Sequence, residues 1–306
     1  MNQNQKNIAW FISYLRNERL YSDKTVLSYQ ENIESFLKFL NQVPEDSKDL
    51  AKIDAYDVQS YLSFLYDQKY SKNSVAQKVS SLRSFYTFLV KNSVVKTEPF
   101  QFVHLKTERN HLPRFFYQDE MNALFQGADS NPNKQLAARD SAILELFYST
   151  GIRVSECVGI RLEDLDMVNQ MLLVFGKGNK QRFVPFGNHC KKALNAYLIV
   201  RKNIMDKYNQ SHKYLFVNHL GRPITPRGIE YILDDVVKRS SLTTNIHPHM
   251  LRHTFATAML NNGADMRSVQ ELLGHSSLSS TQIYTHVTRT HLMDQYKKYF
   301  PRSDSK

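Results

Sequence analysis

Apolar residues in the first hundred positions recur every three or four residues, the spacing of one face of an α-helix. Residues 7–20 show this pattern first, and Ser22 precedes a second run that ends near residue 40. Two further runs follow Asp54 and Ser71, residue types that cap helix N-termini. The repeated apolar positions are Ile8, Phe11, Ile12 and Leu15, then Val26, Tyr29, Ile33, Phe36, Leu37 and Leu40. Four amphipathic helices with short connections predict a small helical bundle.

The pattern changes after this bundle. Residues 103–113 (VHLKTERNHLP) have no periodicity and end in proline, which predicts a linker. Helical patterns then dominate, one of them stopped at Gly151, and two β-prone runs flank a Gly-Lys-Gly-Asn turn, which predicts a hairpin. We therefore expect a mainly α-helical chain with a small β-sheet, formed by a helical domain over 1–102, the linker over 103–113 and a second domain over 114–306.

Charge indicates the class of partner. The chain has 306 residues, a formal net charge of +11 and a pI near 9.4, which suits nucleic acid; a basic membrane-surface protein is the alternative. Residues 1–105 carry 13 basic and 11 acidic residues, so most of the excess lies later in the chain. No apolar run approaches the ~18 residues of a spanning helix, and no signal-peptide stretch begins the sequence. Since two cysteines cannot form a disulfide framework, we expect a cytoplasmic protein with no membrane partner.

The stretch HMLRH, residues 249–253, carries the first candidate chemistry. On a helix, Leu251 and Phe255 fall on a core face, whereas His249, Arg252 and His253 fall near the other face. An arginine fork matches phosphate oxygens, and a histidine beside it can move a proton near neutral pH. The spacing of His249 and His253 also occurs in zinc helices, but that motif needs Glu directly after the first His, and residue 250 is Met. We therefore expect no metal site.

Three other stretches carry polar residues in suggestive places. In TGIRVSE a new helix is expected near Arg153, so that Arg153 and Glu156 share one face. Lys177 stands between two glycines at the predicted hairpin tip, and Tyr284 follows a capping-box pattern in GHSSLSSTQIYTH. Taken alone, each stretch is better explained as ordinary structure: a surface helix, a salt bridge, a turn lysine or a packed tyrosine.

Taken together, these residues form an ordered set. Arg153, Lys177, His249-x-x-Arg252, Gly274-His275 and Tyr284 resemble the active-site set of the tyrosine recombinases, the phage integrase-like family. The phrases TGIRVSE, GKGNKQR, HMLRHTFAT, LLGH and STQIYTHV are similar to the Xer branch of that family, and most to its XerC type. The resemblance covers nearly the whole chain, most strongly in the second half.

The resemblance implies a role for each residue. Tyr284 attacks the scissile phosphate and forms a 3′-phosphotyrosyl link, while Arg153 and Arg252 stabilise charge on the phosphate oxygens. The remaining implied roles are Lys177 as general acid, His249 as the group that manages the tyrosine proton, His275 as a hydrogen-bond donor to the phosphate, and Glu156 as a supporting residue. Because this chemistry needs neither ATP nor a metal ion, no cofactor is expected.

The resemblance also implies partners. An N-terminal four-helix core-binding (SAM-like) domain and a catalytic domain are expected to clamp a duplex dif-like site, with a XerD-like recombinase in a heterotetramer and a septal DNA translocase as further partners. Basic candidates for DNA contact in the first domain are Lys24, Lys72, Lys78 and Arg83. The tail helix, with Leu292, Tyr296 and Phe300 in register, is expected to dock on a neighbouring protomer.

Other functions stay open at this point. A phage or mobile-element integrase would use the same chemistry, and a DNA-binding protein could keep the fold without catalysis. A metal-dependent nuclease would lose activity with a chelator, whereas a recombinase would not. Chromosome-dimer resolution is the function that the resemblance favours.

Overall fold

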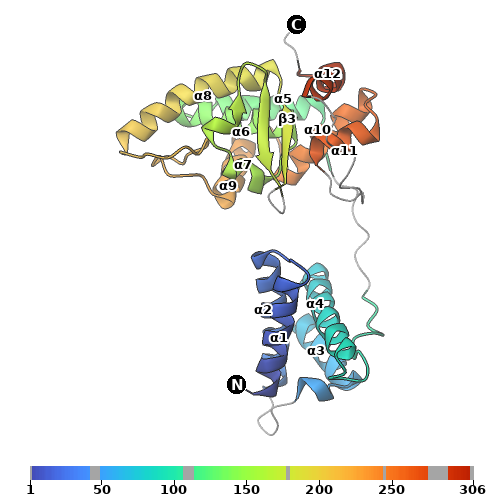
Figure 1. The fold of residues 1–306 in the computed structure, drawn as a ribbon. Coiled ribbons are helices and arrows are strands. Elements are labelled where there is room, and N and C mark those ends of the chain that lie inside the picture. The colour runs from blue at the N-terminus through green and yellow to red at the C-terminus, as the bar shows by residue number, and fades with distance from the viewer. Residues whose placement is uncertain are drawn as a thin grey trace. The chain divides into compact units, whose positions relative to one another are not determined.

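The computed structural model describes residues 2–41, 49–105, 114–176, 180–243, 246–274 and 289–303. The chain divides into two compact units, residues 1–110 and 111–306, which are described separately (Figure 1). Helices dominate both units, and the strands described form one three-stranded antiparallel sheet. The prediction of a mainly α-helical fold with a small sheet is therefore confirmed.

The first unit is a bundle of four described α-helices, as the periodicity predicted. Ser22 and Ser71 cap the second and fourth helices by accepting hydrogen bonds from the backbone N–H groups of Thr25 and Ser74, and Asp54 caps the third in the same way. The helices are α1 (Gln3–Asn17), α2 (Asp23–Leu40), α3 (Ala55–Asp67) and α4 (Lys72–Lys91), with a 3₁₀ turn over Leu50–Lys52.

Aromatic rings fill the interior of this bundle. Phe11 contacts Phe85 edge-on, Phe36 contacts Tyr61 in the same way, and all four are fully buried. At the rim, Trp10 of α1 lies edge-on against Phe88 of α4, with 4.9 Å between ring centroids. The bundle therefore has an aromatic core of its own.

The second unit is built around one buried helix. Every residue of α6 (Lys134–Thr150) from Ala142 to Thr150 is buried, because α5 (Gln118–Asp129), α8 (Asn188–Lys207) and α10 (Pro248–Asn261) all pack against it. The other helices are α7 (Val154–Gly159), α9 (Pro226–Arg239), α11 (Met266–Leu273) and α12 (Arg289–Tyr299), with a 3₁₀ turn over Leu162–Asp164.

The sheet lies beside these helices (Figure 1). Its strands β1 (Leu165–Asp166), β2 (Met171–Phe175) and β3 (Gln181–Pro185) are antiparallel in the order β1-β2-β3. Leu172 pairs with Val184 and Phe175 with Gln181, which is the hairpin that the sequence predicted. Its turn carries Lys177, which is outside the described residues.

Helix α12 packs within its own domain. Tyr296 is fully buried, its hydroxyl lies 2.6 Å from the hydroxyl of Ser149, and the same Ser149 oxygen accepts the backbone N–H of Gly187. Phe300 is buried against Tyr148 and Phe255. In this chain the face of Leu292, Tyr296 and Phe300 therefore packs on its own domain, and its docking on a neighbouring protomer stays a prediction.

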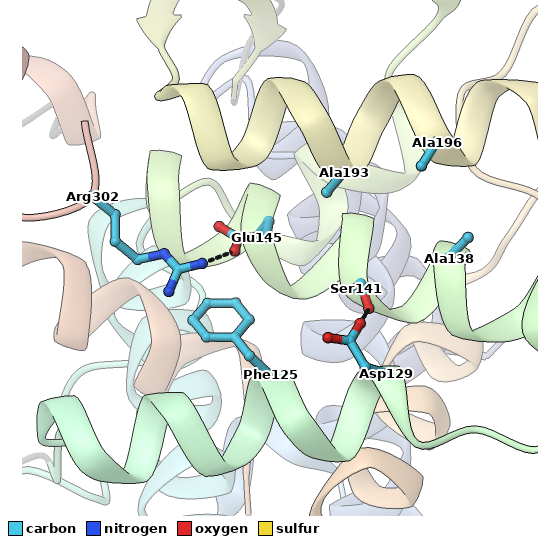
Figure 2. A pocket seen from close by; sticks show the side chains of 8 residues that line it. All are labelled: Phe125, Asp129, Ala138, Ser141, Glu145, Ala193, Ala196 and Arg302. Atoms are coloured by element: carbon cyan, nitrogen blue, oxygen red, sulfur yellow. Dashed lines mark hydrogen bonds and ion pairs between the residues drawn. The ribbon is translucent and has the colours of Figure 1, made fainter. Parts of the chain in front are cut away.

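The residues after α12 border a cavity of about 370 Å³ (Figure 2). The Arg302 guanidinium lies over the Phe125 ring, 4.2 Å from its centroid, and forms an ion pair with Glu145 of α6. Across the cavity the Ser141 hydroxyl donates to Asp129 at 2.6 Å. Burial raises the pKa of Glu145 to about 7, although Arg302 opposes this shift.

The helices that the structure describes include none with the length and apolar character needed to cross a bilayer.

Replacing Tyr296 by Phe should lower the stability of the second domain. The substitution keeps the ring but removes the hydrogen bond to Ser149, at a cost of about 1 kcal/mol. Thermal unfolding followed by circular dichroism should show a midpoint lower by about 2–4 °C. Tyr231→Phe is the matched control, because Tyr231 is 71% exposed and its hydroxyl can be lost without effect. Equal midpoints for both variants would show that the buried hydroxyl contributes nothing.

Glu145 should make the stability depend on pH. The folded carboxyl binds its proton more tightly than the unfolded one, so folding takes up a proton between about pH 4.5 and 7. The free energy of unfolding should therefore fall as pH rises through that window, and this part of the slope should vanish in Glu145→Gln. Urea titrations at pH 5 and 7.5 on both proteins measure the difference; an unchanged slope in the variant would contradict it.

Candidate active site

Arg153 is placed by the sharp end of α6. Gly151 closes that helix in the left-handed conformation, with φ of +58°, and its N–H donates to the Phe147 carbonyl. Two residues later Arg153 is the N-cap of α7. Its backbone N–H donates to Glu156 at 2.8 Å, and its guanidinium donates to the same carboxylate at 2.9 Å. The predicted pairing of Arg153 with Glu156 is therefore present in the structure.

Glu156 has a second arginine partner that the sequence argument did not single out. Arg182 of β3 donates to one carboxylate oxygen at 2.8 Å and to the other at 3.0 Å. Burial alone would raise the pKa of Glu156, but the hydrogen bonds from Arg182 and Arg153 outweigh it and hold that pKa below its ordinary value. The sequence signal that could have identified Arg182 is its place as a basic residue inside a predicted strand, five positions after Lys177.

Arg252 lies inside the domain. It occupies α10, is 8% exposed, and donates to the carbonyls of Gly151 at 2.5 Å and Leu273 at 2.6 Å. The residues of the expected basic face of α10 therefore differ in exposure: His249 is exposed, whereas Arg252 is buried. Burial, and then the nearby Arg153, lower the pKa of Arg252 to about 10. No carboxylate of the described chain lies within ion-pair distance of it.

Lys177, His275 and Tyr284 are outside the described residues, but the residues that border these two segments are described. Gly176, next to Lys177, adjoins the Glu156–Arg182 pair: a methyl group added to it would lie 3.8 Å from an atom of each. Gly274, next to His275, ends α11 directly against the Arg182 side chain. Arg289 follows the segment that carries Tyr284 and stacks on Phe183, 3.7 Å from the ring centroid. Arg182 and Phe183, neighbouring residues of β3, therefore contact Gly274 and Arg289, the two residues that border the segment 275–288.

The charges of this cluster favour an anion. Three guanidinium groups, those of Arg153, Arg182 and Arg252, surround one carboxylate, that of Glu156, which leaves a net charge of +2. Arg182 and Glu156 satisfy each other, and Arg153 keeps donors that the carboxylate does not use. Such an arrangement can bind a phosphate group and stabilise negative charge that develops on it.

The basic candidates of the first unit differ in exposure. Lys24 and Lys72 are exposed in the first turns of α2 and α4. Lys78 is partly buried between these helices, with Asn32 and Ser35 as partners at 3.5 and 3.3 Å, and burial lowers its pKa. Arg83 donates to the carbonyls of Phe100 and Val103, so it holds the end of its own domain, and its contact with DNA stays a prediction. The structure gives this last candidate a structural role.

Sequence comparison places the chain in a family. The phage integrase family matches residues 114–291, and the phage integrase N-terminal SAM-like domain matches residues 8–93. The tyrosine recombinase XerC of Pediococcus pentosaceus is 53% identical over 300 residues, 97% of this chain and 98% of that protein. The tyrosine recombinase XerC of Listeria monocytogenes serotype 4b is 51% identical over 293 residues, 96% of this chain and 97% of that protein.

A solved structure shares the fold. The XerH site-specific recombinase bound to palindromic difH substrate, a post-cleavage complex, matches with a TM-score of 0.69 at 22% identity, over 95% of this chain and 83% of that chain. The chain therefore belongs to the phage integrase family. It is a tyrosine recombinase, an enzyme that breaks and rejoins DNA, and the prediction of this class is confirmed.

Replacing Gly151 by Ala should disturb this site. A methyl group there would lie 2.7 Å from Phe255 and 2.8 Å from Leu273, and the left-handed conformation adds strain of about 1–2 kcal/mol. The shift of Leu273 would also move an acceptor of Arg252. We expect a lower melting temperature and slower DNA cleavage. Gly159→Ala is the control, because nothing lies within 4 Å of the added methyl group; equal behaviour of the two variants would contradict the prediction.

Proposed function

We propose that Tyr284 is the nucleophile that attacks the scissile phosphate, forming a 3′-phosphotyrosyl link and releasing a 5′-hydroxyl. Arg153 and Arg252 bind the non-bridging oxygens, Lys177 protonates the leaving oxygen, His249 manages the tyrosine proton and His275 donates to the phosphate. Glu156 supports the geometry of Arg153. Two guanidinium groups supply the positive charge that this step requires, so the proposal includes no metal ion or nucleotide.

The observation that carries this proposal is the environment of Arg252. The side chain is buried, it lies near a second arginine, and no carboxylate of the described residues lies within ion-pair distance of it, since Glu156 acts on it only through a longer-range charge interaction. Burying a cation without a counter-charge is unfavourable, so an anion that enters here gains more than it would at an exposed arginine. Leu273, which accepts one of its hydrogen bonds, is two residues before His275. The anion site thus adjoins the segment proposed to carry the nucleophile.

The proposal gives the first domain a role in DNA binding. Gln77 of α4 bonds Ser28 of α2, and Asn32 of α2 bonds Ser81 of α4, both at a separation of 49 residues, so the two helices run parallel. Their N-terminal turns, which carry Lys24 and Lys72, therefore lie at the same end of the bundle. Helix N-termini and lysines both attract phosphate, which supports this end as a contact to the DNA backbone.

The biological reaction that we propose is resolution of chromosome dimers in the cytoplasm. The helical domain over 1–102 and the catalytic domain over 114–306 clamp a duplex dif-like site, joined by the linker over 103–113. A XerD-like recombinase completes a heterotetramer, and a septal DNA translocase activates it. This proposal is supported by sequence identities of 53% and 51% to two proteins named XerC, over almost the whole chain. A phage or mobile-element integrase with the same chemistry is the alternative.

Covalent trapping tests the proposal. The chain is incubated in EDTA with nicked duplexes carrying chromosome-terminus recombination sites, with and without a XerD-type partner, and then denatured in SDS. We expect a protein–DNA band that resists SDS, forms despite the chelator and is absent from Tyr284→Phe, whose DNA binding stays normal. The loss of the band is complete because phenylalanine has no nucleophilic oxygen.

Other results point to other functions. Tight binding without a band, even with the partner, would indicate a DNA-binding protein that has lost catalysis. A band that persists in Tyr284→Phe would assign the nucleophile to another residue. Cleavage that stops in EDTA would favour a metal-dependent nuclease.

A further inference from the structure

Arg182 joins three segments of the active-site region through one side chain. From β3 its two terminal nitrogens bind both oxygens of Glu156, at the start of α7. Its Nε lies 3.4 Å from the carbonyl oxygen of Leu272, at the end of α11. The side chain is 16% exposed, so most of the guanidinium is enclosed by these partners.

Gly274 leaves the space that this side chain occupies. A methyl group on Gly274 would lie 2.7 Å from Cδ, 2.8 Å from Nε and 3.0 Å from Cζ of Arg182. Gly274 also adopts the left-handed conformation, with φ of +65°, that glycine favours. The turn that leads into His275 therefore rests directly on the Arg182 guanidinium.

Arg182 also sets how Glu156 divides its hydrogen bonds. The buried carboxylate has two guanidinium partners, and Arg182 binds it through two nitrogens, whereas the Arg153 guanidinium uses one. Without Arg182, Glu156 would have the Arg153 side chain as its remaining cationic partner. Arg153 would then be drawn further toward the carboxylate and away from an anion.

We infer that Arg182 is a positioning residue for DNA cleavage: by holding Glu156 and the end of α11 together, it leaves Arg153 directed at the phosphate. The inference rests on the proposed function, since it assigns Arg153 to phosphate. Arg182 itself contacts no reacting atom in this assignment.

Two substitutions of Arg182 test the inference. Arg182→Lys keeps the charge but cannot bridge both carboxylate oxygens and Leu272, and Arg182→Met removes the charge. We expect covalent complex to form about 10- to 100-fold more slowly in both, because small displacements of positioning groups cost about that much, while DNA affinity changes less than about threefold. Arg267→Lys is the matched control, since Arg267 pairs with Glu271 within α11 on the surface.

The pH profile separates positioning from a general loss of structure. Removing the cation raises the pKa of Glu156, and a protonated Glu156 no longer draws Arg153 toward it, so the deficit of Arg182→Met should be smaller at pH 6 than at pH 8. In a Glu156→Gln background this extra pH dependence should disappear, because the group that titrates is gone. Circular dichroism on each variant confirms that the folded domain is being compared, and Arg182→Lys decides the case if Arg182→Met unfolds.

The possible results distinguish this inference from the proposed function. If the wild-type chain cleaves and both Arg182 variants cleave within threefold of it, the inference is wrong and the proposed function stands. An equal deficit at pH 6 and pH 8, unchanged in the Glu156→Gln background, likewise overturns it. A wild-type chain that forms no covalent complex, even with its partner, overturns both.

Discussion

One buried carboxylate organises the catalytic domain. Glu156 is almost inaccessible to water and is stable there because two guanidinium groups, on α7 and on β3, surround it. A buried ion pair of this kind gains little net stability compared with apolar packing, but it is costly to break. Its value is geometric, since it fixes the distance between the N-terminus of α7 and the hairpin. The remaining arginine, Arg252, then lies in a region of excess positive charge.

Backbone carbonyls at helix ends complete this arrangement. Arg252 binds the carbonyls of Gly151 and Leu273, which end α6 and precede the turn after α11. Both helices end at a glycine in the left-handed conformation, so their last carbonyls are directed toward the arginine instead of continuing a helix. The orientation of the arginines therefore depends on backbone geometry as much as on side-chain pairing.

The sequence predicted the features of the fold that depend on interactions between residues close together in the chain. The caps Ser22, Asp54 and Ser71, the stop at Gly151 and the hairpin were readable because neighbouring residues decide them. Burial of Arg252 was not readable, since helical spacing gives a face but not the acceptors that lie opposite it. Arg182 was missed for the same reason: its three contacts are with residues 26 to 92 positions away. Packing of α12 on its own domain required knowing that Ser149 offers a partner to Tyr296.

The aromatic rim of the first unit has a spectroscopic consequence. Trp10 is the only tryptophan of the chain, and it rests on Phe88 at the contact between α1 and α4. Its ring is 46% exposed, which leaves its emission sensitive to anything that covers or loosens this rim. Fluorescence excited at the red edge of protein absorption therefore reports on the helical bundle alone. The first unit can thus be followed by itself, without a label, as DNA is added.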